Sequence, residues 1–183
     1  MSGVLGGLIA AFPTPVTSSF ESIASVTPNG QSVSFTSIPQ TYQHLQVRVM
    51  ARRNDTVSFS NDLVELNNDS SNIYTRHYLE ADGSSVIAGG GTGRLSGQIN
   101  NAITGNNATS NTYGVYILDI HDYANTSKYK TGRYVSGFDL NGSGGVNIGS
   151  FLWQSTSAIT SLDFDNYTYS SGSVFSLYGI KGA

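Results

Sequence analysis

The feature of this sequence that most constrains its fold is the alternation of apolar and polar residues between short turn motifs. From His44 to Val49 the alternation is strict, with Leu45, Val47 and Val49 on one side. A period of two residues is typical of a half-buried β-strand, because successive side chains of a strand point to opposite faces. We therefore expect residues 44–49 to form a strand that turns these three side chains into the core.

The same pattern recurs along the chain from Phe20 onward, and it predicts many short strands. Turn motifs separate many of them, including Asp82-Gly83, Asn141-Gly142 and Ser171-Gly172. The candidate strands are 20–26, 33–35, 44–49, 56–66, 73–80, 84–88, 94–99, 112–120, 132–139, 146–153, 159–165 and 173–180. This spacing predicts an all-β fold, a single antiparallel β-sandwich of the jelly-roll kind over residues 20–183. No segment predicts a helix of useful length.

Composition excludes several classes of function. Charged residues make up 11% of the chain and the net charge is −3, which argues against a nucleic-acid-binding protein. The absence of cysteine excludes disulfides, a thiolate zinc site and a cysteine nucleophile. The longest apolar run, 4–12, is shorter than the ~20 residues that cross a membrane. The first basic residue is Arg48, so we also expect no signal peptide.

Residues 1–19 do not follow the alternating pattern, and they predict an extended, apolar N-terminal arm. Pro13, Pro15 and several glycines oppose a long helix or a central strand. An exposed apolar segment is unfavourable in water. The arm should therefore pack on its own domain or on a neighbouring protein, and we favour the neighbour. The residues that would bind this partner are Leu5, Leu8, Ile9, Phe12 and Val16.

Two short clusters contain residue types that could bind a metal ion. Asp119, His121 and Asp122 offer two carboxylates and an imidazole to a divalent cation. We favour the alternative, in which a strand ends here and a polar loop follows. Asp163 and Asp165 lie on one face of a candidate strand and could bind Ca²⁺ or share a proton. No EF-hand spacing surrounds them, so we expect no metal site.

Other catalytic arrangements have little support. A glycosidase needs two carboxylates that flank a sugar, and the candidates are Glu65, Glu80, Asp163 and Asp165. The glycine-rich run 89–94 could contact phosphate, but it lacks the Lys-Ser/Thr ending of a P-loop and no helix follows. We expect this run to be a flexible hairpin. No Gly-x-Ser-x-Gly motif occurs. We therefore expect no enzyme, no catalytic residue and no cofactor.

Aromatic residues are concentrated in the second half of the chain. They are Tyr113, Tyr116, Tyr123, Tyr129, Tyr134, Trp153, Tyr167, Tyr169 and Tyr178. Such side chains can form protein interfaces, fill the core of a sandwich, or stack on sugar rings when they are exposed. We favour protein interfaces over the core, and the core over sugar binding.

Both ends of the alternating region have distinctive sequences. The first is FESIASV at 20–26 followed by VSFTSIPQTYQHLQVR at 33–48, and the second is FSLYGIKG at 175–182. These segments resemble the opening and the last strand of small structural proteins of tailed bacteriophages, including cyanophages. The resemblance covers about residues 20–52 and 159–183. It implies a non-enzymatic virion component with a jelly-roll domain, either a capsid decoration (cement) protein or a module of a tail fibre or spike.

Within that class, the sequence favours a capsid decoration protein. One sandwich with an apolar arm suits a domain on the capsid exterior whose arm binds the major capsid protein. The alternative is a tail fibre, spike or adaptor component that binds host polysaccharide, although 183 residues leave little room for an attachment domain and a shaft. Few charges are available to guard the sheet edges, and capsids offer threefold sites, so we expect a homotrimer. We expect no nucleic acid or membrane partner.

Overall fold

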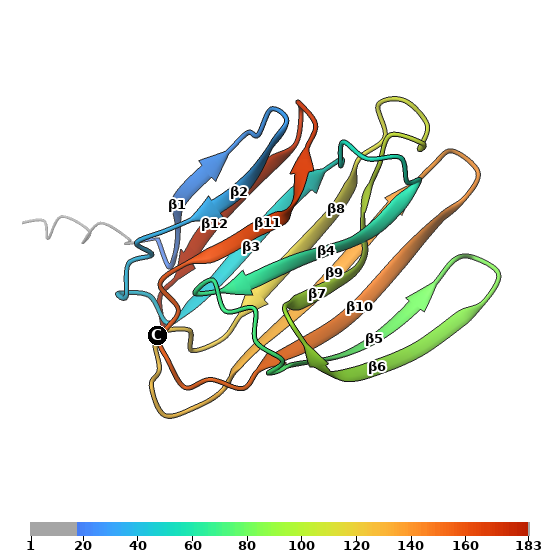
Figure 1. Cartoon of the computed structure of the whole chain (residues 1–183). Helices are drawn as coiled ribbons and strands as arrows, with labels where there is room; N and C mark the ends of the chain where they lie inside the picture. Colours follow the sequence, from blue (N-terminus) through green and yellow to red (C-terminus); the bar gives the residue numbers. More distant parts are fainter. Residues whose placement is uncertain (1–17, 183) are drawn as a thin grey trace, which may run out of the picture.

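The computed structural model describes residues 18–182, and over this range the chain is built of β-strands joined by turns and loops, with no helix (Figure 1). The strands are β1 (Phe20–Val26), β2 (Gln31–Phe35), β3 (His44–Ala51), β4 (Phe59–Leu66), β5 (Tyr74–Ala81), β6 (Val86–Arg94), β7 (Gly97–Thr104), β8 (Gly114–Ile120), β9 (Lys130–Asp139), β10 (Gly144–Trp153), β11 (Leu162–Tyr169) and β12 (Val174–Ile180). Each predicted strand overlaps one of them. The arm residues 1–17 lie outside the described range.

The strands form two antiparallel sheets that face each other, so the predicted β-sandwich is confirmed. The larger sheet has eight strands in the order β1-β12-β3-β8-β9-β10-β5-β6. The smaller sheet has four, in the order β2-β11-β4-β7. In Figure 1 the smaller sheet lies in front of the larger one, and β6 and β1 form the two edges of the larger sheet.

The core lies between the two sheets, and the strand predicted at 44–49 contributes to its centre. Leu45 and Val47 are fully buried, and Val49 is nearly so. The closing strand β12 pairs with β3 and places Phe175 opposite Val49 and Leu177 opposite Val47. The predicted inward face of this strand and its packing against β12 are therefore confirmed.

The core also contains one buried carboxylate, Asp62 on β4. The hydroxyl of Tyr116 donates to its Oδ2 at 2.8 Å, and the hydroxyl of Tyr169 donates to its Oδ1 at the same distance. The backbone N–H of Leu63 donates to Oδ1 as well. Burial opposes the charged form more strongly than these bonds favour it, and it raises the pKa of Asp62 to about 6.

The glycine run 89–94 is not the flexible hairpin that we expected, because it belongs to the edge strand β6. The turn comes earlier, where the Asp82 carboxylate accepts hydrogen bonds from the backbone N–H groups of Ser84 and Ser85. The ring of Tyr78 on β5 covers Gly89 so closely that a Cβ there would lie 2.5 Å from it. Gly89 and Gly90 therefore make room for the side chains of Tyr78 and His77 on β5.

Candidate interaction surface

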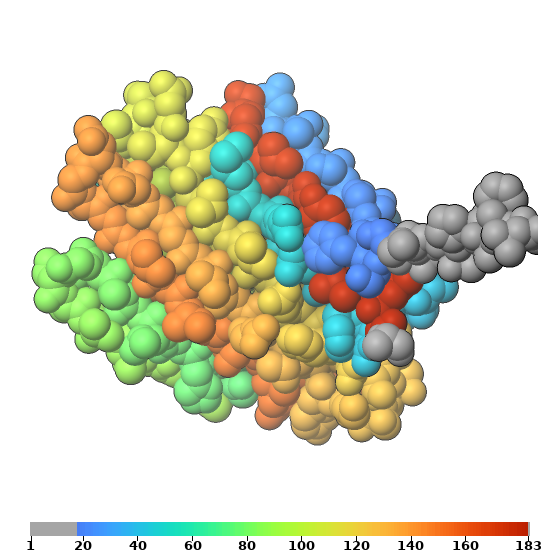
Figure 2. All heavy atoms as spheres, turned by 180° about the vertical axis from the view of Figure 1, so that it is seen from behind, coloured from blue at the N-terminus to red at the C-terminus, as the bar shows by residue number. Residues whose placement is uncertain are grey.

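The outer face of the eight-stranded sheet, turned away from the smaller sheet, carries a continuous set of exposed aliphatic side chains. Figure 2 views this face, with the strands running in order from green β5 and β6 to blue β1. The aliphatic residues are Met50 on β3, Val115 and Ile117 on β8, Val135 on β9, Val146 and Ile148 on β10, Leu79 and Ala81 on β5, and Val86 and Ala88 on β6. We call this set the apolar stripe. Its large members expose between 41% (Met50) and 69% (Val86) of their surface.

The stripe consists of two adjacent rows that cross the strands, and Val135 lies at the centre of the first. Val135 pairs with Ile117 on one side and with Ile148 on the other. The row continues from Ile148 to Leu79, and from Leu79 to Ala88 at the sheet edge. Directly paired residues of neighbouring strands lie on the same face of a sheet. The register therefore makes these side chains one surface instead of scattered exposed residues.

The second row contains a hollow at Gly137. This glycine lies between Val115 on β8 and Val146 on β10, and it leaves no side chain in the row. Val115, Val135, Gly137 and the neighbouring Arg48 line a shallow groove of about 440 Å³. The groove gives the stripe a depression that a partner's side chain can fill.

Polar side chains border the stripe on one side and are paired among themselves. Asp119 accepts a hydrogen bond from Gln46 at 2.8 Å and forms an ion pair with Arg133 at 3.6 Å. Arg48 donates to Gln46 and lies over the ring of Tyr178. An apolar centre beside a polar rim is the usual arrangement of a protein interface. The outer face is therefore the candidate interaction surface of the described chain.

The structure separates the residues of the first predicted metal cluster. Asp119 lies on the outer face, whereas Asp122 follows β8 and pairs with Lys128 at 3.0 Å. That hydrogen bond lowers the pKa of Asp122. His121 is exposed and its ring packs edge-on against His44. Between residues 18 and 182, no three His, Asp or Glu side chains come together in a way that could hold a metal ion.

The four candidate glycosidase carboxylates do not form one site. Glu65 and Asp163 are cross-strand neighbours in the smaller sheet, and Asp163 accepts a hydrogen bond from Ser161 at 2.8 Å. Burial raises the pKa of Glu65, and the nearby carboxylates act in the same direction. Glu80 belongs to the larger sheet, where its carboxylate accepts a hydrogen bond from Asn100 at 2.7 Å. Asp165 is exposed on β11, two residues beyond Asp163. Glu80 therefore lies in a different sheet from the other three candidates.

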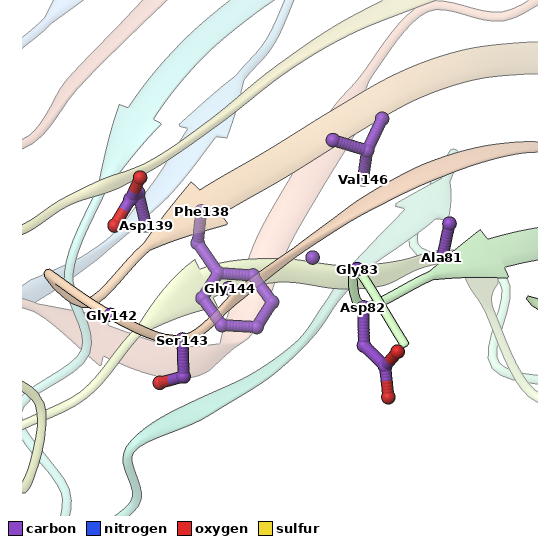
Figure 3. Close-up of a pocket in the computed structure, with 10 residues that line it drawn as sticks. Ala81, Asp82, Gly83, Phe138, Asp139, Gly142, Ser143, Gly144 and Val146 are labelled. Atoms are coloured by element: carbon purple, nitrogen blue, oxygen red, sulfur yellow. The ribbon is translucent and has the colours of Figure 1, made fainter. Parts of the chain in front are cut away.

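A hollow between the β5–β6 and β9–β10 turns contains two further carboxylates, those of Asp82 and Asp139 (Figure 3). The Asp82 carboxylate accepts hydrogen bonds from the backbone N–H groups of its own turn, and these hydrogen bonds lower its pKa. Asp139 likewise accepts from the backbone N–H of Asn141 in its own turn. Phe138 lines the same hollow. Both carboxylates stabilise turns, so the hollow offers no free acid–base pair.

The favoured assignment of the aromatic residues to an interface is wrong for most of them, because they fill the core. Tyr116, Tyr123, Tyr134, Trp153 and Tyr169 are buried, and Tyr113, Tyr167 and Tyr178 are partly buried. The indole N–H of Trp153 donates to Asp69 at 2.8 Å. Of the nine, Tyr129 is the one exposed residue, at 54%. Buried tyrosines are accommodated where their hydroxyls find partners, as those of Tyr116 and Tyr169 do on Asp62.

The stripe was not predicted from the sequence, although one signal for it is present. Val115 to Leu118 is an unbroken apolar run on β8, which places apolar residues on both faces of the strand. Such runs are typical of strands that are covered on both sides. In the described chain the smaller sheet covers one face, and the other face of β8 is exposed.

The predicted arm residues Leu5, Leu8, Ile9, Phe12 and Val16 lie outside the described range, so the structure places none of them. Within residues 18–182, no helix has the length and apolar character to span a membrane.

Comparisons with known proteins assign neither a family nor a function to the chain. No family model and no curated protein matches the chain. Among solved structures, the chain is similar to the galectin LEC-6 of Caenorhabditis elegans, with 9% sequence identity and a TM-score of 0.35. The alignment covers 86% of this chain and 96% of the galectin. At this identity and TM-score, the similarity adds nothing to the assignment of function.

Proposed function

We propose that this chain is a non-catalytic structural component of a larger assembly, and specifically a decoration protein on the capsid exterior of a tailed bacteriophage. The single observation that carries the structural role is the apolar stripe. The phage assignment is supported by the resemblance of residues 20–52 and 159–183 to structural proteins of these viruses.

The size of the stripe supports a role in an assembly. Its eight large residues are each 41–69% exposed, so together they expose on the order of several hundred Å², comparable to the largest apolar patch of a typical monomer, which is about 300–600 Å² and often functional. A surface of this kind is unfavourable in water and marks a site of interaction with a partner. In the proposed role the partners are the major capsid protein, which would receive the arm, and other copies of this chain.

The polar groups of the described chain are also consistent with a structural role. Asp82 and Asp139 stabilise their own turns, Asp119 pairs with Gln46 and Arg133, and Asp62 is buried in the core. Catalysis by a carboxylate needs an accessible group at a cleft that a substrate can enter. In this account the carboxylates stabilise the sandwich, and its outer face binds the partner.

Quantitative mass spectrometry of purified particles tests the proposal. For a phage whose genome encodes this chain, we expect a copy number comparable to that of the major capsid protein. A chain that is absent from purified particles would contradict the structural role. A few copies that separate with isolated tails would contradict the decoration role and support the tail alternative, which binding to host polysaccharide would then test.

A further inference from the structure

We infer that the apolar stripe binds a second copy of this chain, so that two eight-stranded sheets pack face to face. This inference names one partner within the proposed structural role and rests on that role. It is carried by three properties of the stripe, which are its area, its arrangement in rows, and the distribution of charge beside it.

The area of the stripe fits one interface between two copies. Stable protein interfaces bury about 800 Å² on each partner. The stripe supplies on the order of several hundred Å² of mainly apolar surface, and the adjoining polar row supplies the remainder of a standard interface. The area is sufficient for one such interface and too small for two. A homotrimer, which the sequence predicts, needs each copy to contact two others, so the stripe favours a pair.

The arrangement in rows allows the stripe to match itself. A two-fold axis that lies between the faces and runs along the strands keeps each row opposite the same row of the other copy. Centred between β9 and β10, this axis brings Val135 of one copy opposite Ile148 of the other. Two packed sheets keep their strands within about 30° of each other, and their facing side chains interdigitate. The hollow at Gly137 then receives apolar side chains of the second copy.

The charges beside the stripe are distributed so that this pairing avoids repulsion. In the polar row, Asp119 on β8 and Arg133 on β9 lie in one half of the face, while Arg48 on β3 belongs to the neighbouring first row of the stripe, beside Ile117. In the other half, the same polar row contains Ser150 on β10 and His77 on β5, opposite Arg133 and Asp119 of the second copy. The two-fold axis therefore places the charged half of one copy against the half without Lys, Arg, Asp or Glu in that row. Like charges directly opposite each other would destabilise the pair.

The test uses the full chain and one substitution at the centre of the stripe, Val135→Lys. Val135 is 53% exposed, so the fold should tolerate lysine, whereas a face-to-face pair would bury the charge without a partner. The matched control is Thr131→Lys, on the same strand and the same face but outside the stripe. Both variants keep residues 1–17, so any association through the arm is equal in the two. A second variant, Ile148→Ser, removes apolar surface without adding charge and replaces Val135→Lys if that protein does not fold.

Light scattering across a dilution series measures the result. We expect twice the chain mass for the parent and for Thr131→Lys, and one chain mass for Val135→Lys, with a dissociation constant weakened roughly a hundredfold or more. A parent protein that is monomeric or trimeric overturns the inference. A Val135→Lys protein that forms a dimer like the parent also overturns it. A parent that is monomeric in solution but abundant in particles overturns the pairing and leaves the decoration role intact. A paired chain that is absent from particles overturns the decoration role.

Discussion

At the scale of single residues, Asp62 is the group with the most distinct chemistry. It lies in the core, where Tyr116, Tyr169 and the N–H of Leu63 donate to it, and its pKa is raised from 3.8 to about 6. A raised carboxyl pKa means that the folded protein holds a proton that the unfolded chain has lost between about pH 4 and 6. The free energy of unfolding therefore falls as pH rises through this window, and the contribution of Asp62 is constant above it.

The substitution Asp62→Asn tests this dependence. The amide oxygen can still accept from Tyr169 and Leu63, and the hydroxyl of Tyr116 can turn to accept from the amide N–H. For the parent, Asp62 should lower the free energy of unfolding by roughly 2 kcal/mol between pH 4 and pH 7. Urea unfolding at these two pH values should show that the variant lacks this loss. The same pH dependence of the free energy of unfolding in parent and variant would show that Asp62 is not its source.

At the scale of strands, the pairing of β3 with β12 holds the centre of the sandwich. Val47 is fully buried opposite Leu177. The substitution Val47→Asp would place an unpaired charge in the core, and we expect a loss of roughly 4–5 kcal/mol or more in the free energy of unfolding. The control Thr131→Asp, at an exposed strand position, should stay within about 0.5 kcal/mol of the parent. Thermal melting followed by circular dichroism measures both, and a Val47→Asp protein that melts like the parent would show that this face is not the core.

The N-terminal arm is the element that the proposed role assigns to attachment. Residues 1–17 lie outside the described range and the two sheets are complete without them. Deletion of residues 1–17 should therefore leave a folded β domain that no longer binds particles, because in the proposed role the arm provides the apolar contact with the capsid. Co-sedimentation with particles that lack the protein measures attachment. Equal attachment of the truncated and the full chain would contradict this role.

The comparison of sequence and structure shows what a period of two residues can predict. Alternation and turn motifs are local signals, so the strands and the inward face of 44–49 could be predicted. The glycine run 89–91 could not, because its place in β6 depends on Tyr78 in the neighbouring strand. Partner strands also determine the stripe, since Ile117 and Val135 become neighbours through the pairing of β8 with β9. The outward or inward direction of a tyrosine depends in the same way on a distant partner such as Asp62.

At the scale of the whole molecule, the two faces of the larger sheet differ in what covers them. The inner face is buried by the smaller sheet, while the outer face carries the apolar stripe beside a paired polar row. The two edges also differ. Both edge strands have a register shift against their neighbour, but β1 also carries Glu21, which pairs with Lys181, whereas β6 has no charged residue before Arg94. Charges protect sheet edges from association, so β1 is the better protected edge.

The central claim is that a protein partner covers the outer face in the working state of the chain. Hydroxyl-radical footprinting of the particle-bound protein tests it most directly, with the free Val135→Lys chain as the reference. Leu79 and Ile148 in the stripe should be protected in particles, whereas Tyr129, which is exposed outside the stripe, should be labelled equally in both samples. Labelling of Leu79 and Ile148 in particles at the level of the free chain would contradict the account.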